Sequence, residues 1–158
     1  MCRALILAVL FAGLMHTAAA ESPASFEWSK EKFDLVATGD AQLGKKAAKK
    51  FKCKKCHNKD GISDDEDIPS IAGQRATYLY KQLHDFKVGV REDDDMQKAT
   101  RKMNEEDMVH VSAWFASLER PAMVGGDPLL QVKVCDSCHD KDIVEKDNHI
   151  EVAPILTG

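Results

Sequence analysis

The sequence predicts an all-α protein made of one complete helical unit and the beginning of a second. Three segments between residues 40 and 118 carry apolar side chains at three- and four-residue spacing, which indicates amphipathic helices. No period-two run of β-branched residues occurs, so no strand is expected. A short pattern of two Cys followed by His occurs at 53–57 and again at 135–139. Its repetition predicts two related units.

Residues 1–20 have the features of a secretory signal peptide. Arg3 gives a positive start, residues 5–14 are apolar, and an Ala-Ala-Ala sequence precedes the expected cleavage site. The apolar run is shorter than a membrane-spanning helix requires. We therefore expect export to the periplasm, with no membrane span after cleavage. Residues 21–38 are expected to form an N-terminal extension that packs through its aromatic side chains.

The first expected helix begins after Asp40, a plausible N-cap. Leu43, Ala47 and Phe51 recur at four-residue spacing and are expected to form its buried stripe. The opposite face is rich in lysine. This helix would deliver the first Cys-His pattern, 53–57, at its C-terminal end.

Two further helices are expected in the first unit. One covers residues 75–88 and ends at Gly89, which suits a C-cap. The other begins near Asn104, an N-cap candidate, with acidic residues in its first turn. Between them an acidic loop, 92–95, leads to Met96. The expected apolar faces are Ala76, Leu79, Leu83 and Phe86 in one helix and Met108, Val111, Phe115 and Leu118 in the other.

The pattern Cys53-Lys54-Lys55-Cys56-His57 is the sequence form of covalent c-type haem attachment. Each Cys can form a thioether with a haem vinyl group, and the imidazole can reach the iron from one side. The second copy supplies Cys135, Cys138 and His139. We therefore expect two haem c groups.

Other interpretations of the cysteines fit less well. In an oxidising compartment disulfides are the usual expectation, but they would not explain the His after each pair. A zinc ribbon would need its two pairs much closer together in sequence, and a thioredoxin-like motif would need βαβ flanks. The mild formal net charge of −4 suggests no nucleic-acid partner.

The second half of the chain copies part of the first. Each Cys-His pattern is followed by a Pro-x-Ile/Leu-x-Gly sequence, at 69–73 and at 154–158, whereas residues 74–120 have no counterpart. We therefore expect a tandem arrangement whose second domain is incomplete in this sequence. The expected boundaries are 39–120 for the first domain, 121–128 for a linker and 129–158 for the partial second domain.

A Met thioether is the expected sixth ligand of the first iron, because it is a soft donor that raises the reduction potential. Met96, Met103 and Met108 follow His57 in the sequence. Met108 has the helical spacing of a core residue, and Met103 stands at a helix start. Met96 is expected in a loop that can approach the iron opposite His57, with Met103 as the alternative. No Met follows the second pattern, and His149 is expected to be an exposed loop residue, so the second site lacks its distal ligand.

Together these features resemble the class I c-type cytochromes, in particular the tandem dihaem cytochrome c4 family and its single-haem relatives. The resemblance covers residues 40–118 well and residues 127–158 in part. In that family a Met seven positions before the last helix is the distal ligand, which implies Met96. A Pro carbonyl typically accepts from the proximal His, which implies Pro69 for the first site and Pro154 for the second.

The expected function is periplasmic electron transfer by iron that cycles between Fe(II) and Fe(III), and not catalysis, because His/Met ligation leaves no open position for a substrate. Its partners would be redox proteins such as an oxidase, reductase or dehydrogenase. One alternative is the cytochrome subunit of a periplasmic dehydrogenase complex, such as a sulfide-oxidising flavoprotein. Another is a dihaem peroxidase. The lysines between residues 45 and 59 are either an ordinary solvated face or a docking surface for an acidic redox partner.

Overall fold

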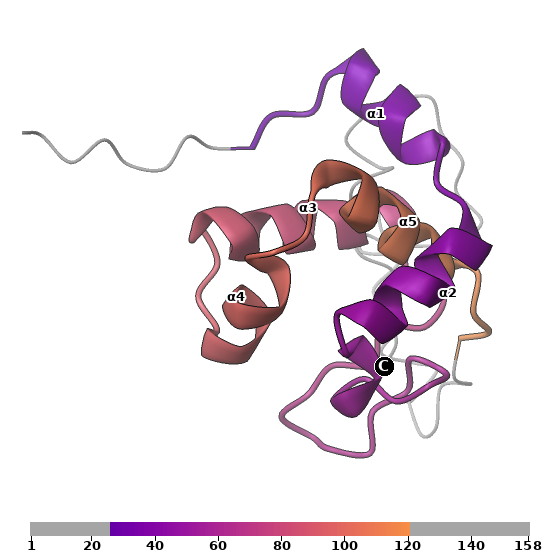
Figure 1. Ribbon diagram of the computed structural model, residues 1–158, viewed down its shortest axis with the longest axis vertical. Helices are drawn as coiled ribbons and strands as arrows, with labels where there is room; N and C mark the ends of the chain where they lie inside the picture. The colour runs from indigo at the N-terminus through magenta and orange to yellow at the C-terminus, as the bar shows by residue number, and fades with distance from the viewer. Residues whose placement is uncertain (1–25, 121–158) are drawn as a thin grey trace, which may run out of the picture.

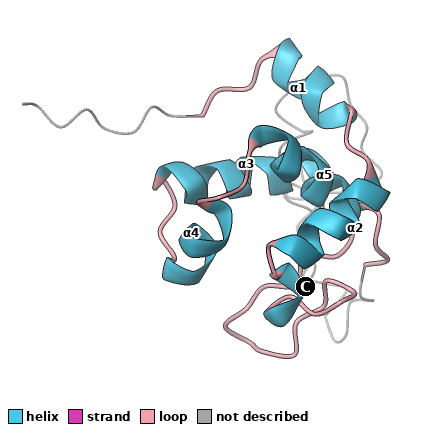
Figure 2. Ribbon diagram, in the orientation of Figure 1, coloured by secondary structure: helices cyan, strands magenta, loops and turns pink. Residues whose placement is uncertain are grey.

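A computed structural model describes residues 26–120 of the chain. Within this range all regular elements are helical, as expected from the sequence (Figure 2). They are α1 (Lys30–Ala37), α2 (Ala41–Lys50), the short 3-10 helix η1 (Cys53–Lys55), α3 (Ala76–Val88), α4 (Asp94–Thr100) and α5 (Glu105–Ala116). None of these helices is long and apolar enough to cross a membrane. The expected signal peptide, linker and second domain lie outside the described residues.

The N-terminal extension contains a helix that was not expected. Ser29 caps α1, and its hydroxyl accepts a hydrogen bond from the backbone of Lys32 at 3.4 Å. The aromatic packing is confirmed: the Trp28 and Phe33 rings stack with centroids 4.5 Å apart, and Phe26 meets Trp28 edge-on at 5.0 Å. Phe26 also meets Tyr80 of α3 at 6.0 Å. The extension therefore packs against the helical domain through aromatic rings.

Helix α2 begins where the sequence predicts. One carboxylate oxygen of Asp40 accepts hydrogen bonds from the backbone of Gln42 at 2.7 Å and of Leu43 at 2.9 Å. The expected stripe is partly wrong, since the Leu43 side chain is 43% exposed. The residues that α2 buries are its smallest ones, Gly44, Ala47 and Ala48.

Helix α2 buries its small residues because it crosses α5 closely. Figure 1 shows these two helices side by side. A methyl group at Gly44 would lie 1.9 Å from the carbonyl oxygen of His110 and 2.7 Å from the Cβ atom of Trp114. His110 also accepts a hydrogen bond, through Nδ1, from the backbone of Asp40 at 3.0 Å. The small residues of α2 thus allow the two backbones to approach closely, and a larger side chain such as Leu43 lies outside this contact.

Helix α3 ends at the expected residue, Gly89, and helix α5 begins after the expected cap, Asn104. Gly89 adopts a left-handed conformation with φ of 80° after the last turn of α3. Asn104 caps α5 in a capping box: its side chain accepts from the backbone of Asp107 at 2.7 Å, and the Asp107 carboxylate accepts from the backbone of Asn104 at 3.2 Å. These local signals therefore determine the helix ends that they predict.

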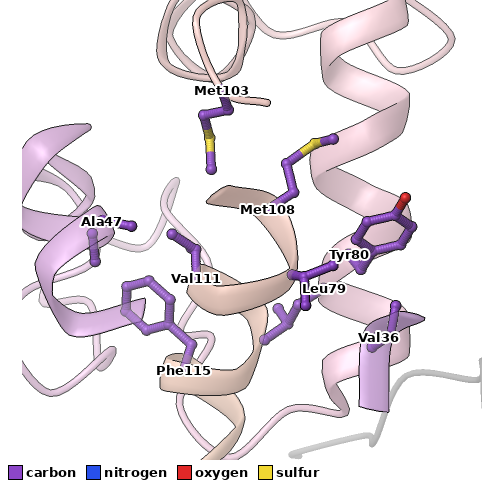
Figure 3. Packing of buried hydrophobic residues seen from close by; sticks show 10 residues of the cluster. Val36, Ala47, Leu79, Tyr80, Met103, Met108, Val111 and Phe115 are labelled. Atoms are coloured by element: carbon purple, nitrogen blue, oxygen red, sulfur yellow. The ribbon is translucent and has the colours of Figure 1, made fainter. Parts of the chain in front are cut away.

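The hydrophobic core lies between α2, α3 and α5, with Val36 of α1 at its edge (Figure 3). Met108, Val111 and Phe115 of α5 and Leu79 and Phe86 of α3 are buried, as expected from their spacing. The remaining predicted face residues, Ala76, Leu83 and Leu118, are partly buried.

Tyr80 and Met103 are among the buried residues that the sequence pattern does not place in the core. Tyr80 is 1% exposed, and its hydroxyl donates a hydrogen bond to the Glu105 carboxylate at 2.8 Å. Met103 is also 1% exposed, and Figure 3 shows its side chain pointing into the cluster, towards Val111. The loop before α5 thus contributes to the core as well as the helices do.

Candidate functional site

The first Cys-His pattern forms a tight turn directly after α2. Lys52 adopts a left-handed conformation with φ of 63°, which ends the helix and reverses the chain. The carbonyl of Cys53 then accepts hydrogen bonds from the backbone of Cys56 at 3.3 Å and of His57 at 3.1 Å. This turn brings two free thiols and one imidazole together on a short stretch of chain, with Cys53 partly buried and Cys56 exposed.

The ring of His57 is buried and held in one orientation. It is 7% exposed, and its Nδ1 lies 3.0 Å from the carbonyl oxygen of Pro69. A carbonyl oxygen can only accept a hydrogen bond, so Nδ1 carries the proton and Nε2 keeps its lone pair. The contact expected from the family resemblance is therefore present.

The protonation state of His57 suits metal binding. Burial lowers the pKa of His57, and the hydrogen bond to the Pro69 carbonyl opposes this effect only in part. The imidazole is therefore held neutral, the form that can coordinate a metal ion through Nε2. Phe115 meets the imidazole edge-on, with ring centroids 6.5 Å apart.

The loop between His57 and Pro69 is closed by its own hydrogen bonds. The carbonyl of Gly61 accepts from the backbone of Ile71 at 2.8 Å and of Ala72 at 3.0 Å. Gly61 has φ of +75°, and a Cβ atom there would lie 3.0 Å from the nitrogen of Ala72. A residue with a side chain would therefore be strained at this position. The closed loop holds the Pro69 carbonyl against His57.

The donor set fits a haem better than a bare metal ion. Burial, as the main cause, raises the pKa of the Cys53 thiol to about 11, so this group is not a ready thiolate ligand. Among the residues that the structure describes, no group of three or more His, Cys, Asp or Glu side chains could hold a metal ion. A haem supplies four ligands to its own iron. Two thiols for covalent attachment and one axial imidazole are what it would need here from this segment.

The position of Met96 differs from the expectation. It lies in the first turn of α4 and is partly buried, not in a loop. The carboxylate of Asp93 caps this helix by accepting from the backbone of Asp95 at 3.1 Å and of Met96 at 2.8 Å. The acidic run 92–95 leads into a helix and not the predicted loop, because carboxylates are favourable at a helix N-terminus.

The two candidate thioethers differ in how they are packed. Met103, the alternative ligand, is buried in the core. Met96 is only partly buried. It lies on α4, which packs against α3. Met96 therefore comes from a separate element and is not part of the turn that holds Cys53 and His57. The residues of the expected second site, Cys135, Cys138, His139 and Pro154, lie outside the described residues.

Two residues that shape the site were not assigned to it from the sequence. Phe115 was expected only in the core, and its contact with the His57 ring depends on how α5 lies beside the turn. Gly61 lay in a segment without helical periodicity. A Gly between the Cys-His pattern and Pro69 is the signal that could have indicated a tight turn there.

Comparisons with known proteins agree with this geometry. The family model for cytochrome c matches residues 41–119. Cytochrome c4 of Pseudomonas aeruginosa is 33% identical over 117 residues, which are 65% of this chain and 57% of that protein. Cytochrome c-554(548) of Halomonas halodenitrificans is 30% identical over 84 residues, which are 51% of this chain and 99% of that protein.

A solved structure shows the same arrangement of helices. Reduced recombinant cytochrome c4 from Pseudomonas stutzeri matches with a TM-score of 0.52 and 28% identity, over 64% of this chain and 56% of that one. The chain thus spans only about half the length of the cytochromes c4 it matches. The chain belongs to the cytochrome c family, as a class I c-type cytochrome related to the cytochromes c4.

Proposed function

We propose that this protein is a periplasmic electron carrier with covalently bound haem c. Cys53 and Cys56 would hold the first haem, and His57 and Met96 would coordinate its iron. The observation that carries the proposal is the buried His57, whose Nδ1 is engaged by Pro69 immediately after two free thiols. This arrangement leaves Nε2 as the donor atom with which His57 would coordinate the iron.

When bound, the haem supplies a one-electron Fe(II)/Fe(III) couple. The residues of the chain bind it, orient it and adjust its potential. The Pro69 carbonyl holds His57 in one tautomer and increases the basicity of Nε2. Phe115 meets the imidazole edge-on and helps to fix the position of its ring. Coordination by both the His57 imidazole and the Met96 thioether would leave no position open for a substrate, which favours a carrier over an enzyme.

The assignment of Met96 is tested by replacing Met96 with Ala in the holoprotein. The ferric spectrum should change from low-spin to high-spin, because the iron loses its thioether ligand. The reduction potential should fall by on the order of 0.1 V, since the thioether favours Fe(II).

The matched control is Met103→Leu, a swap that conserves volume in the core and should cost less than about 1.5 kcal/mol of stability. Its spectrum and potential should remain those of the wild type. If Met103→Leu and not Met96→Ala produced the high-spin spectrum, the distal ligand would be Met103. Carrier function itself is tested by stoichiometric, reversible reduction with ascorbate and oxidation with ferricyanide.

We further propose that residues 1–20 are removed on export and that a second haem is attached through Cys135 and Cys138, with His139 as its proximal ligand. The supporting observation is the repeated Cys-His pattern followed each time by a Pro-containing segment. The intact mass of the protein purified from the periplasm measures both features. It should correspond to a chain without residues 1–20 that carries two haems, and Cys135→Ser with Cys138→Ser should reduce the count to one.

A further inference from the structure

A groove of about 500 Å³ lies between the C-terminal half of α2, the Cys-His turn and the C-terminal end of α5. Its apolar part is formed by Ala48 of α2 and by Trp114, Phe115 and Leu118. Ala48 and Phe115 are buried, whereas Trp114 and Leu118 are partly exposed. The groove therefore offers an apolar floor that is open to solvent.

Lysines surround this floor. Lys45, Lys49, Lys54 and Lys59 all line the groove, and all four are exposed. The ammonium group of Lys45 lies 5.2 Å from the centroid of the Trp114 ring, so the rim and the floor are in contact. Asp60 is the only acidic residue that lines the groove within the described part of the chain.

We propose that this groove is a docking site for an acidic segment of a partner protein that inserts an apolar or aromatic side chain between the lysines. The cationic rim is complementary to carboxylates, and the Trp114 and Leu118 surface is complementary to an apolar side chain. The whole chain has a formal net charge of −4, so the attraction comes from this local cluster and not from the overall charge.

A peptide segment fits this site better than a membrane surface does. The floor is recessed between two helices and a loop, and a flat layer of lipid headgroups would contact the lysines without covering the floor. A protruding side chain can reach the floor while its acidic neighbours meet the rim. Apolar floor and charged rim together are the usual composition of a protein interface.

The location connects the groove to the proposed haem site. Phe115 forms part of the floor, and its ring also meets the His57 ring, with centroids 6.5 Å apart. A partner bound here lies one aromatic ring away from the proximal imidazole. The inference rests on the proposed electron-carrier function and identifies the face on which a redox partner binds.

The experiment uses the full-length holoprotein and two synthetic peptides at low ionic strength. One peptide has a single phenylalanine between aspartates, and the other has serine in place of the phenylalanine. Isothermal titration should show 1:1 binding of the phenylalanine peptide. The serine peptide should bind at least about tenfold more weakly, because it cannot cover the floor.

Matched pairs of lysine variants locate the site. Lys49→Gln with Lys59→Gln removes two charges from the rim and should weaken binding about tenfold, which corresponds to about 1.4 kcal/mol. Lys46→Gln with Lys55→Gln removes two charges from exposed lysines that do not line the groove and should change the affinity less than about twofold. The haem content of each variant is measured in parallel.

Three results would overturn the proposal: equal weakening by both pairs, equal binding of both peptides, or binding to phosphatidylglycerol vesicles without binding to the phenylalanine peptide. Reversible reduction by ascorbate does not depend on the peptide. A protein that does not bind the peptide but is reduced reversibly would therefore refute the docking site and not the carrier function. A protein that binds the peptide but does not undergo reversible reduction would instead refute the carrier function.

Discussion

Replacing Gly44 with Ala tests the crossing of α2 and α5, on which the position of the Cys-His turn depends. The added methyl group would lie 1.9 Å from the carbonyl oxygen of His110 and 2.7 Å from the Cβ atom of Trp114. The first of these atoms belongs to the backbone of α5, so it cannot rotate away. The two helices must therefore separate by more than about 1 Å to restore ordinary van der Waals contact.

The expected loss of stability is the difference between two effects. Overpacking of this kind costs about 1–3 kcal/mol, occasionally more, and a backbone obstacle places this case at the upper end. Ala is a better helix former than Gly by about 1 kcal/mol, which offsets part of the cost. The net destabilisation should be about 2 kcal/mol, which lowers the melting temperature of a domain of this size by about 8–16 °C.

Thermal unfolding of the holoprotein, followed by circular dichroism, measures this effect. The control is Lys46→Ala, an exposed position on the same helix, which should change stability by less than about 0.5 kcal/mol. A Gly44→Ala protein as stable as the wild type, or more stable, would refute the close helix crossing. The gain in helix propensity would then be the only effect of the substitution.

Two further substitutions examine hydrogen bonds at the start of α5. Tyr80→Phe removes the bond to Glu105 and should cost about 1–2 kcal/mol in urea unfolding at neutral pH. Burial, reinforced by the bond to Glu105, raises the pKa of Tyr80. The wild type should therefore lose stability as the pH rises above about 10, the unfolded-state pKa. Tyr80→Phe should lack this loss, and an equal loss in both proteins would exclude Tyr80 as its source. Asn104→Ala removes the cap of α5 and should cost about 1 kcal/mol, whereas Asn104→Ser should retain most of the stability; equal unfolding midpoints for the two variants would argue against the cap.

Local signals in the sequence predicted several helix ends correctly. Asp40, Gly89 and Asn104 stand where their side chains or backbone conformations complete a helix terminus, and this chemistry needs only neighbouring residues. The same kind of signal occurs at Asp93, whose acidic neighbours start α4 and do not form the loop around Met96 that the sequence pattern predicts. Both α1 and α4 were missed although Ser29 and Asp93 cap them.

The choice of which side chains are buried depended on contacts between distant segments. Spacing alone placed Leu43 in the core, because it repeats with Ala47 and Phe51. The approach of α5 instead selects the small residues beside Gly44 and leaves Leu43 exposed. Periodicity gives the direction of an apolar stripe, but it does not say how close the neighbouring helix will come.

The sequence by itself determined the all-helical class of the described domain, the capped ends of α2, α3 and α5, and the place of the Cys-His pattern after α2, because these follow from periodicity, capping and a short motif. The tertiary structure decided what surrounds that turn. It set the Pro69 carbonyl against His57, placed Phe115 of α5 beside the same ring and formed the lysine-rimmed groove next to it. Loop closure through Gly61 brings Pro69 to His57. The Phe115 contact and the groove join segments far apart in the chain, and packing of α2 against α5 brings these together.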